Sequence, residues 1–518
     1  MRKRSKIVYL LLIVALVVNL VVPTSMVIAN NQPVNDTSNT VTGDVYGSSA
    51  RISALSVTQS VYEIPVNIIT DVVMTNDKKE NISVVRPDQG SKVQIDFKWE
   101  LPANHPYLEG STFTFNLPKH FILDSEKTGD LGIYGTFIVT PEGKVTFTFS
   151  KEIEGTAVTN GTFNVWRSFD EKSFVGGTHQ DIEFIYQGES DIVPVHFLSK
   201  STSEIDKKGT PNKGKNASEV SWEVDFNKGE KSITNAIFKD ELPTGLTVDM
   251  NSIEVVELIV KLDGSVEEKT TPFIGNAPVP NVNGFQLDFG NINNAYRVKY
   301  TTTITGTSDK TYNNKVTVSG DNLPKAQETS KAVAVTYSKP INKTSTGYNS
   351  STQTITWVIE YNYNEQKIAQ SNAWIKDIFD KTTQALVPGS FKVTEMKIED
   401  NGNATSKGVV TNYDIDETLA DGFLLAFKDK IESAYRIEYK TTSINRVYGD
   451  AVAVKNTVEM SGVTPVDKTV NMNQVIFKKN NGKVNFNKKT IDWTINLNND
   501  NQLMSDVVSM IVMQRVKD

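Results

Sequence analysis

The chain has 518 residues, of which 38% are hydrophobic and 22% are charged, so it holds enough apolar material for several ordinary cores. It contains no cysteine, which excludes disulfides, thiolate nucleophiles and thiolate metal sites. Its formal net charge of −7 disfavours nucleic acid as a partner.

Residues 1–29 predict a secretory signal peptide. Four basic residues precede an apolar run from Ile7 to Val22, and Val27-Ile28-Ala29 follows as a small-residue cleavage site. A retained membrane anchor is the alternative, because the run is nearly long enough to span a bilayer. Pro23 interrupts the run and favours cleavage, which changes the net charge from −7 to −11. No membrane insertion is then expected of the mature chain.

A β-rich domain is predicted at 52–198, after a flexible leader at 30–51 that lacks any sustained pattern. Apolar and polar residues alternate from Val93 to Leu101, a period of two that fits a strand and not a helix. A turn at Pro141-Glu142-Gly143 between two further alternating stretches predicts a hairpin. Many short strands separated by turns are typical of an antiparallel sandwich.

A tryptophan strand recurs three times along the rest of the chain. Trp222, Trp357 and Trp493 each sit among alternating apolar residues, and they are 135 and 136 residues apart, a domain-sized period. We therefore expect β-sandwiches at 199–337 and 338–475. The predicted fold class is all-β, with tandem antiparallel β-sandwich domains.

Residues 476–518 begin a third copy that stops early. About a quarter of a module cannot close a core, so this end is interpreted as a truncated fragment. No wall-sorting signal is present in it.

Catalytic and metal-binding patterns are weak, and no enzyme, cofactor or metal site is predicted. The four histidines all precede residue 199, without zinc-ligand spacing. No nucleophile elbow, phosphate loop or dinucleotide fingerprint occurs. Asn498 to Asn501 lacks the glycine and closing glutamate of a calcium loop, so turn chemistry explains it better.

A lysine, an aspartate and an asparagine accompany the tryptophan strand of the third domain. Ile341 and Lys343 share a strand face, and Asp377 follows Trp357 by 20 residues. If that face is inward, burial lowers the lysine pKa and raises the aspartate pKa. A neutral amine is a nucleophile, and a protonated carboxyl can polarise the amide of Asn456, so the set predicts an autocatalytic Lys–Asn isopeptide crosslink. The alternative is a surface lysine, a turn aspartate and a strand-end asparagine.

The second domain carries a corresponding set, Lys207, Asp240 and Asn314. Ile205, two residues earlier, favours Lys207 as the nucleophile. Lys208 remains the alternative, because it lies 14 residues before Trp222, as Lys343 does before Trp357. Such a bond is expected to join the first and last strands of a module.

These motifs resemble the isopeptide-bearing domain of the collagen-binding adhesins (MSCRAMM class) of Gram-positive bacterial surfaces. The first domain, with Trp99-Glu100-Leu101-Pro102 and Pro141-Glu142-Gly143-Lys144, is similar to the Ig-like lobe that precedes that domain. The resemblance covers about residues 52 to 475. It implies tandem Ig-like (IgG-variant) sandwich domains. It also implies a secreted or wall-bound, monomeric adhesin that holds collagen or another extracellular-matrix protein between its first two lobes.

The resemblance leaves the ligand contacts open. Trp166, Phe169 and Phe174 are candidate lining residues, with a core role as the alternative. A latch strand near Ala332 to Tyr337 would double as a linker to the next module, which argues against free latching. A structural stalk or surface-layer protein without a ligand is the alternative function.

Overall fold

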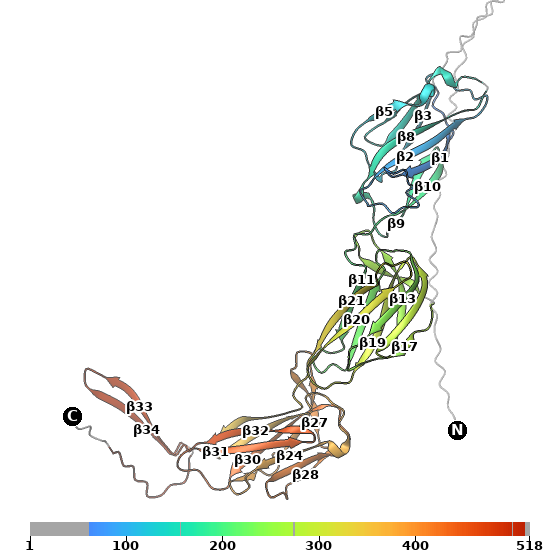
Figure 1. Ribbon diagram of the computed structural model, residues 1–518. Helices are drawn as coiled ribbons and strands as arrows, with labels where there is room; N and C mark the ends of the chain where they lie inside the picture. Colours follow the sequence, from blue (N-terminus) through green and yellow to red (C-terminus); the bar gives the residue numbers. More distant parts are fainter. Residues whose placement is uncertain (1–61, 156, 273–274, 500, 513–518) are drawn as a thin grey trace, which may run out of the picture. The chain divides into compact units, whose positions relative to one another are not determined.

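The computed structural model describes residues 62–512, except 156, 273–274 and 500. The predicted signal peptide and leader lie outside this range. The described residues form strands and short 3-10 turns, which confirms the all-β fold class (Figure 1). Within these residues there is no helix that could cross a lipid bilayer. The 3-10 turns are η1 (Gly132–Tyr134), η2 (Lys151–Ile153), η3 (Glu171–Ser173), η4 (Met250–Ser252) and η5 (Gln370–Asn372).

The first sandwich pairs a sheet of order β1-β2-β8-β4 with one of order β10-β9-β3-β7-β6-β5, both antiparallel. The expected hairpin is present as β6 and β7. Its strands are β1 (Ile69–Thr75), β2 (Lys92–Leu101), β3 (Thr112–Asn116), β4 (Phe121–Ile122), β5 (Lys127–Asp130), β6 (Gly135–Val139), β7 (Lys144–Phe149), β8 (Thr159–Phe169), β9 (His179–Tyr186) and β10 (Glu189–His196).

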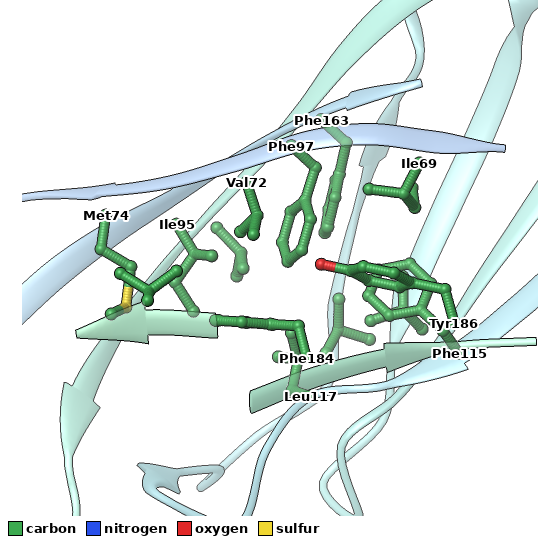
Figure 2. Packing of buried hydrophobic residues seen from close by; sticks show 14 of the residues in the cluster. Ile69, Val72, Met74, Ile95, Phe97, Phe115, Leu117, Phe163, Phe184 and Tyr186 are labelled. Carbon is green, nitrogen blue, oxygen red and sulfur yellow. The ribbon is translucent and has the colours of Figure 1, made fainter. Parts of the chain in front are cut away.

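Aromatic rings fill the core of the first sandwich (Figure 2). The alternation predicted from Val93 to Leu101 is β2, whose apolar face is buried. Phe97 stacks on Phe163 with 5.3 Å between ring centroids, and it meets Phe115 edge-on at 5.3 Å. Burying rings of this size contributes a large part of the stability of such a domain.

The second and third sandwiches have the same strand order, shifted by eleven strands. Their sheets run β11-β12-β19-β15-β16 with β17-β18-β13-β20-β21, and β22-β23-β30-β26-β27 with β28-β29-β24-β31-β32. The short strands β14 and β25 pair with β19 and β30. This match is what a repeat of whole domains predicts.

The strands of the second sandwich are β11 (Ile205–Pro211), β12 (Glu219–Phe226), β13 (Ile233–Glu241), β14 (Leu246–Val248), β15 (Glu254–Val260), β16 (Val266–Pro272), β17 (Val279–Asn281), β18 (Gly284–Ile292), β19 (Ala295–Ile304), β20 (Lys310–Ser319) and β21 (Gln327–Val335). Those of the third are β22 (Ile341–Asn349), β23 (Thr354–Tyr361), β24 (Trp374–Phe379), β25 (Gln384–Leu386), β26 (Lys392–Ile398), β27 (Ala404–Val410), β28 (Tyr413–Asp416), β29 (Gly422–Phe427), β30 (Ala434–Ser443), β31 (Val452–Met460) and β32 (Val463–Met472).

The third copy of the tryptophan strand forms an isolated hairpin of β33 (Phe477–Asn485) and β34 (Thr490–Leu497). Trp222 and Trp357 are 1% and 0% exposed, whereas Trp493 is 52% exposed. The same alternating pattern is therefore buried only where a second sheet covers it.

Candidate crosslinking site

Both sheets of the third sandwich contribute to a polar cluster in its core. Lys343 on β22 lies opposite Ile359 of β23, and Tyr439 on β30 lies opposite Trp357. Asp377 on β24 and Asn456 on the neighbouring strand β31 come from the other sheet. Because inward-facing residues of the two sheets interdigitate, the four side chains meet between the sheets.

The contacts of this cluster form a closed network. Lys343 Nζ donates a hydrogen bond to Asp377 Oδ2 and another, of 2.8 Å, to Tyr439 Oη. The Tyr439 hydroxyl donates to Asp377 Oδ1 at 2.6 Å and accepts from Asn456 Nδ2 at 2.7 Å. The lysine and aspartate side chains are both 0% exposed. The amine, the carboxyl group and the amide thus share one site that is shielded from bulk solvent.

The second sandwich builds the same cluster from equivalent strands. Lys207 Nζ donates to Asp240 Oδ2 and, at 2.8 Å, to Tyr300 Oη. The Tyr300 hydroxyl donates to Asp240 Oδ2 at 2.6 Å, and Asn314 Nδ2 donates to Tyr300 Oη at 2.9 Å. Both charged side chains are again 0% exposed. The two sandwiches therefore repeat a site, and not only a fold.

Burial shifts the pKa values in the direction that favours neutral groups. Desolvation lowers the pKa of Lys207 to about 8, against the attraction of Asp240, and it also lowers the pKa of Lys343. Desolvation likewise raises the pKa of Asp240 and of Asp377. The pKa values of Tyr300 and Tyr439 are raised by burial and by the adjacent aspartate, so both stay hydroxyl donors. Burial thus moves the lysine and the aspartate of each cluster toward their neutral forms.

A glycine beside each aspartate holds the site together. Gly422 begins β29 and has φ +145, and a Cβ placed there would lie 1.7 Å from the carbonyl oxygen of Asp377. Gly284 is its equivalent, with φ +150 and 2.2 Å to the carbonyl oxygen of Asp240. A side chain at either position would push away the strand that carries the aspartate.

The tyrosines are the part of the site that sequence reasoning missed. Tyr300 and Tyr439 end the stretches Tyr296-Arg297-Val298-Lys299-Tyr300 and Tyr435-Arg436-Ile437-Glu438-Tyr439, which correspond to each other in the two repeats. The alternation of apolar and polar residues could have indicated that these tyrosines point inward. Tyr300 and Tyr439 each lie two residues after a buried residue, Val298 or Ile437, and so share its strand face. Their hydroxyls touch all three other members of each cluster.

The register between β11 and β12 shows which of Lys207 and Lys208 points into the core of the second sandwich. Lys207 lies opposite Val224, the second residue after Trp222, just as Lys343 lies opposite the second residue after Trp357. Lys208 points outward, with 69% of its side chain exposed and Glu223 at 3.6 Å. A bulge between Ser345 and Gly347 alters the spacing in the third sandwich, which explains why counting residues favoured Lys208.

Lys479 repeats this register in the isolated hairpin. It lies opposite Ile495, the second residue after Trp493, and its Nζ is 4.3 Å from the Trp493 ring centroid. The equivalent distances are 5.1 Å for Lys207 over Trp222 and 5.4 Å for Lys343 over Trp357. The hairpin alone therefore positions the lysine over the ring, but without the second sheet the amine stays in water.

Asn314 and Asn456 lie on β20 and β31, each the last strand but one of its sandwich. The expectation that a crosslink joins the first and last strands is therefore wrong in detail. Residues 332–335 belong to β21, which pairs with β20 of the same sandwich. The segment expected as a latch is thus already part of a sheet.

The candidate ligand-lining residues divide into core and surface. Phe169 and Phe174 are 0% and 6% exposed, and Phe169 packs against Phe121 and Phe197, so the two rings offer almost no surface to a ligand. Trp166 on β8 is half-buried, with Lys79 and Lys92 each 5.6 Å from its ring centroid.

Two histidines and a glutamate form a group that spacing along the sequence did not indicate. His179 and His196 face each other across β9 and β10, and with Glu230 their ligand atoms lie within 4.8 Å of one another. Glu230 Oε2 accepts from Arg86 at 2.9 Å, from Thr178 at 2.8 Å and from His196 at 3.0 Å. That oxygen is fully engaged, so an ion-pair network accounts for the group without a metal.

Comparison with protein families defines the class. Residues 202–329 and 339–464 match the family model of a collagen binding domain, and residues 86–178 match that of a bacterial Ig domain. The chain therefore contains one domain of the bacterial Ig family followed by two of the collagen-binding family, which supports a protein of the collagen-binding adhesin type. Neither family is one of enzymes. No curated protein sequence matches the chain.

Several solved structures are similar to it. The Enterococcus faecalis MSCRAMM ACE, described as binding its ligands by the collagen Hug model, is 18% identical, with 52% of this chain and 95% of that chain covered and a TM-score of 0.21. The collagen adhesin CNA of S. aureus is 15% identical, with 54% and 95% covered and a TM-score of 0.20. At these low scores the family models, and not the individual structures, support the assignment.

Proposed function

We propose that the chain is an exported surface adhesin of a Gram-positive bacterium that binds an extracellular-matrix protein, with collagen favoured, through its first two sandwiches. The observation that carries this proposal is the pair of matches to the collagen binding domain family. The predicted signal peptide supports export, and the acidic balance of −7 argues against a nucleic-acid partner.

Binding of the purified mature chain to immobilised matrix proteins tests the adhesin proposal. Saturable binding to triple-helical collagen, with weaker binding to the same collagen after heat denaturation, is the expected result. Fibronectin and laminin serve as comparison surfaces. Absence of saturable binding to every one of these surfaces would reject the proposal and favour a structural stalk, for which the repeated buried clusters are the supporting observation.

We further propose that each of the two clusters forms an isopeptide bond, between Lys343 and Asn456 and between Lys207 and Asn314. The neutral amine Nζ attacks Cγ of the asparagine amide, and the protonated aspartate polarises the amide oxygen. The bond from Cγ to Nδ2 then breaks, and the proton given up by the lysine amine reaches the departing nitrogen through the aspartate. Ammonia leaves, and a neutral amide replaces the buried amine and the primary amide.

Unsatisfied atoms in the clusters support this chemistry. Asn456 Oδ1, Asn314 Oδ1 and Asp240 Oδ1 are buried and have no hydrogen-bond partner. A proton on the aspartate would turn the carboxyl group into a donor for the amide oxygen, and hydrogen bonds of this kind are worth about 1 kcal/mol or more. The protonated acid is thus both the form that burial favours and the form that activates the amide.

Intact mass under denaturing conditions decides the crosslink. The mature chain is expected to lack the mass of two ammonia molecules, one for each complete sandwich. Lys207→Ala should restore one of them, whereas the matched control Lys208→Ala, at the exposed neighbouring position, should restore none. An unshifted mass for the parent chain would reject the crosslink and leave the adhesin proposal standing.

A further inference from the structure

Arg167 is a buried charge of the first sandwich that makes no ion pair, although the nearby Asp124 carboxylate partly offsets the effect of desolvation on its pKa. It occupies an inward-facing position of β8 between Val165 and Phe169 and is 3% exposed. Its Nη1 donates to the carbonyl oxygen of Trp166 at 3.0 Å, but Nε and Nη2 have no hydrogen-bond partner. Among the described residues no carboxylate forms an ion pair with it. Because a guanidinium cannot shed its proton, burying one unpaired is costly.

Arg297 shows that the Nε and Nη2 edge of a guanidinium, the edge without partners in Arg167, can bind a carboxylate. In the second sandwich, Arg297 Nε donates to Asp225 Oδ1 at 2.6 Å and Nη2 donates to Asp225 Oδ2 at 2.7 Å. These are the same two nitrogen atoms that lack partners in Arg167. Their two parallel N–H bonds match the two oxygens of a carboxylate.

A hollow with excess positive charge lies in front of Arg167. It has a volume of about 360 Å³ and is lined by Lys92, Ile122, Asp124, Lys127, Trp166, Arg167 and Ser168. Three basic residues oppose one acidic residue in this lining. The strand β4 ends at Ile122, and this edge of the sheet is where the hollow forms. An anion entering here meets two exposed lysines first and the guanidinium last.

We propose that this hollow binds the carboxylate of an acidic side chain from a polypeptide partner, with the Nε and Nη2 edge of Arg167 as its bidentate donor. Lys92 and Lys127 attract the carboxylate, and the half-buried Trp166 ring packs against the apolar part of the same side chain. The fork pairs with a carboxylate through two parallel bonds, and the Trp166 ring favours an acid carried on an apolar side-chain stem over bare sulfate. Both guanidinium nitrogen atoms are shielded from solvent, so the lining side chains must shift for the carboxylate to reach them. The proposal does not depend on collagen being the ligand.

Fluorine NMR of the full mature chain, labelled with 5-fluorotryptophan, tests this site. The chain has six tryptophans, and Trp166→Phe assigns the one signal that belongs to the hollow. The probes are an acetylated Gly-Glu-Gly amide, its Gly-Gln-Gly counterpart and sodium sulfate. The Glu peptide is expected to shift the Trp166 signal saturably, while the Gln peptide and sulfate leave it in place.

Substitutions in the hollow provide the second arm. Arg167→Met should reduce the affinity for the Glu peptide by about tenfold or more. Lys92→Gln and Lys127→Gln should each reduce that affinity by about two- to fivefold. Lys144→Gln, on β7 outside the hollow, is the matched control and should have no effect. The exposed lysine variants keep the test decisive if Arg167→Met does not fold.

Three results would overturn the proposal. Equal shifts of the Trp166 signal by the Glu and Gln peptides would show that binding does not require a negative charge. An equal shift by sulfate would show that the hollow does not prefer a carboxylate side chain. Binding that appears only in Asp124→Asn would show that Asp124 itself occupies the guanidinium edge in solution.

Discussion

The first sandwich and the two that follow it close the same kind of fold around different cores. In the first, aromatic rings such as Phe97 and Phe163 fill the interior, and among its described residues Arg167 is the buried charged side chain. The second and third sandwiches bury a complete lysine–aspartate pair instead. An apolar core is therefore sufficient for a sandwich of this type. Burying a lysine and an aspartate adds a cost that an apolar core does not carry, and the proposed crosslink would offset that cost.

The isolated hairpin extends this comparison. Lys479 lies over its tryptophan as Lys207 and Lys343 do, yet its side chain belongs to a strand whose residues are all exposed. One hairpin fixes the position of the amine, whereas the second sheet fixes its protonation state. The buried cluster is thus a product of sandwich closure, and the proposed reaction needs both sheets in place.

The largest effect is expected for Lys343→Ala. A bond from Lys343 to Asn456 closes a loop of 113 residues, worth roughly 4 to 5 kcal/mol if the disulfide relation applies. If the parent chain carries the ion pair and not the bond, the variant instead leaves Asp377 buried without its partner, a change that costs about 3–5 kcal/mol in comparable cases. Calorimetry of the full chain should show the transition of the third sandwich at a much lower temperature, with one ammonia regained in the mass.

Lys376→Ala is the control for this variant. Lys376 is next to Asp377 but points outward, with 31% of its side chain exposed, and it pairs with Asp421 at 3.1 Å. Its removal should change stability by about 0.5 kcal/mol or less. Equal effects of the two lysine substitutions would contradict the distinction between a reactive and a surface lysine.

The next largest effect is expected for Phe97→Ala in the first sandwich. Removing a fully buried ring that packs on Phe115 and Phe163 should cost about 3–5 kcal/mol. Calorimetry should show only the transition of the first sandwich shifting, and the mass should still lack two ammonia molecules. A changed ammonia count would mean that the crosslinks depend on the aromatic core, and the two kinds of core would not be independent.

A smaller effect, on rate, is expected for Tyr300→Phe. Its hydroxyl holds Asp240 and Asn314 in register, and loss of hydrogen bonds to a charged group costs about 1.5–3 kcal/mol, or roughly ten- to a hundredfold in rate. Mass spectrometry during refolding from urea measures the loss of ammonia with time. Tyr312→Phe is the control, because the Tyr312 hydroxyl is buried without a hydrogen-bond partner. An unchanged rate of ammonia loss in Tyr300→Phe would show that the tyrosine hydroxyl does not contribute to the reaction.

Alternation and repetition were enough to predict the fold from the sequence. The faces around Trp222 and Trp357 are buried as expected, and the hairpin at Pro141-Glu142-Gly143 is present, because both follow from local periodicity and turn chemistry. Residues far apart in sequence were harder to place. Choosing Lys207 over Lys208 by counting was ambiguous, since a single bulge changes the count, and only the strand register places one of them inside.

The tyrosines and the aromatic candidates show a second limit. Tyr439 looks like any other core residue in the sequence, and its contacts with Asp377 and Asn456 depend on how two sheets face each other. Phe169 and Trp166 differ in exposure although both lie on β8, because alternate residues of a strand point to opposite faces. Residue type alone could not divide ligand contacts from core.

The smallest effect is expected for pH. With a pKa of about 8, against about 10.5 for an ordinary lysine, Lys207 should be roughly one-tenth neutral at pH 7 and half neutral at pH 8. Since only the neutral amine attacks, the rate of ammonia loss from the second sandwich should rise about fivefold over this interval. The aspartate opposes this rise at higher pH, because attack also needs its protonated form, and burial raises the pKa of Asp240. Refolding the Lys343→Ala variant at a series of pH values isolates the second sandwich. A rate that is flat from about pH 6 to 9 would contradict the predicted rise and show that loss of the aspartate proton cancels the gain in neutral amine.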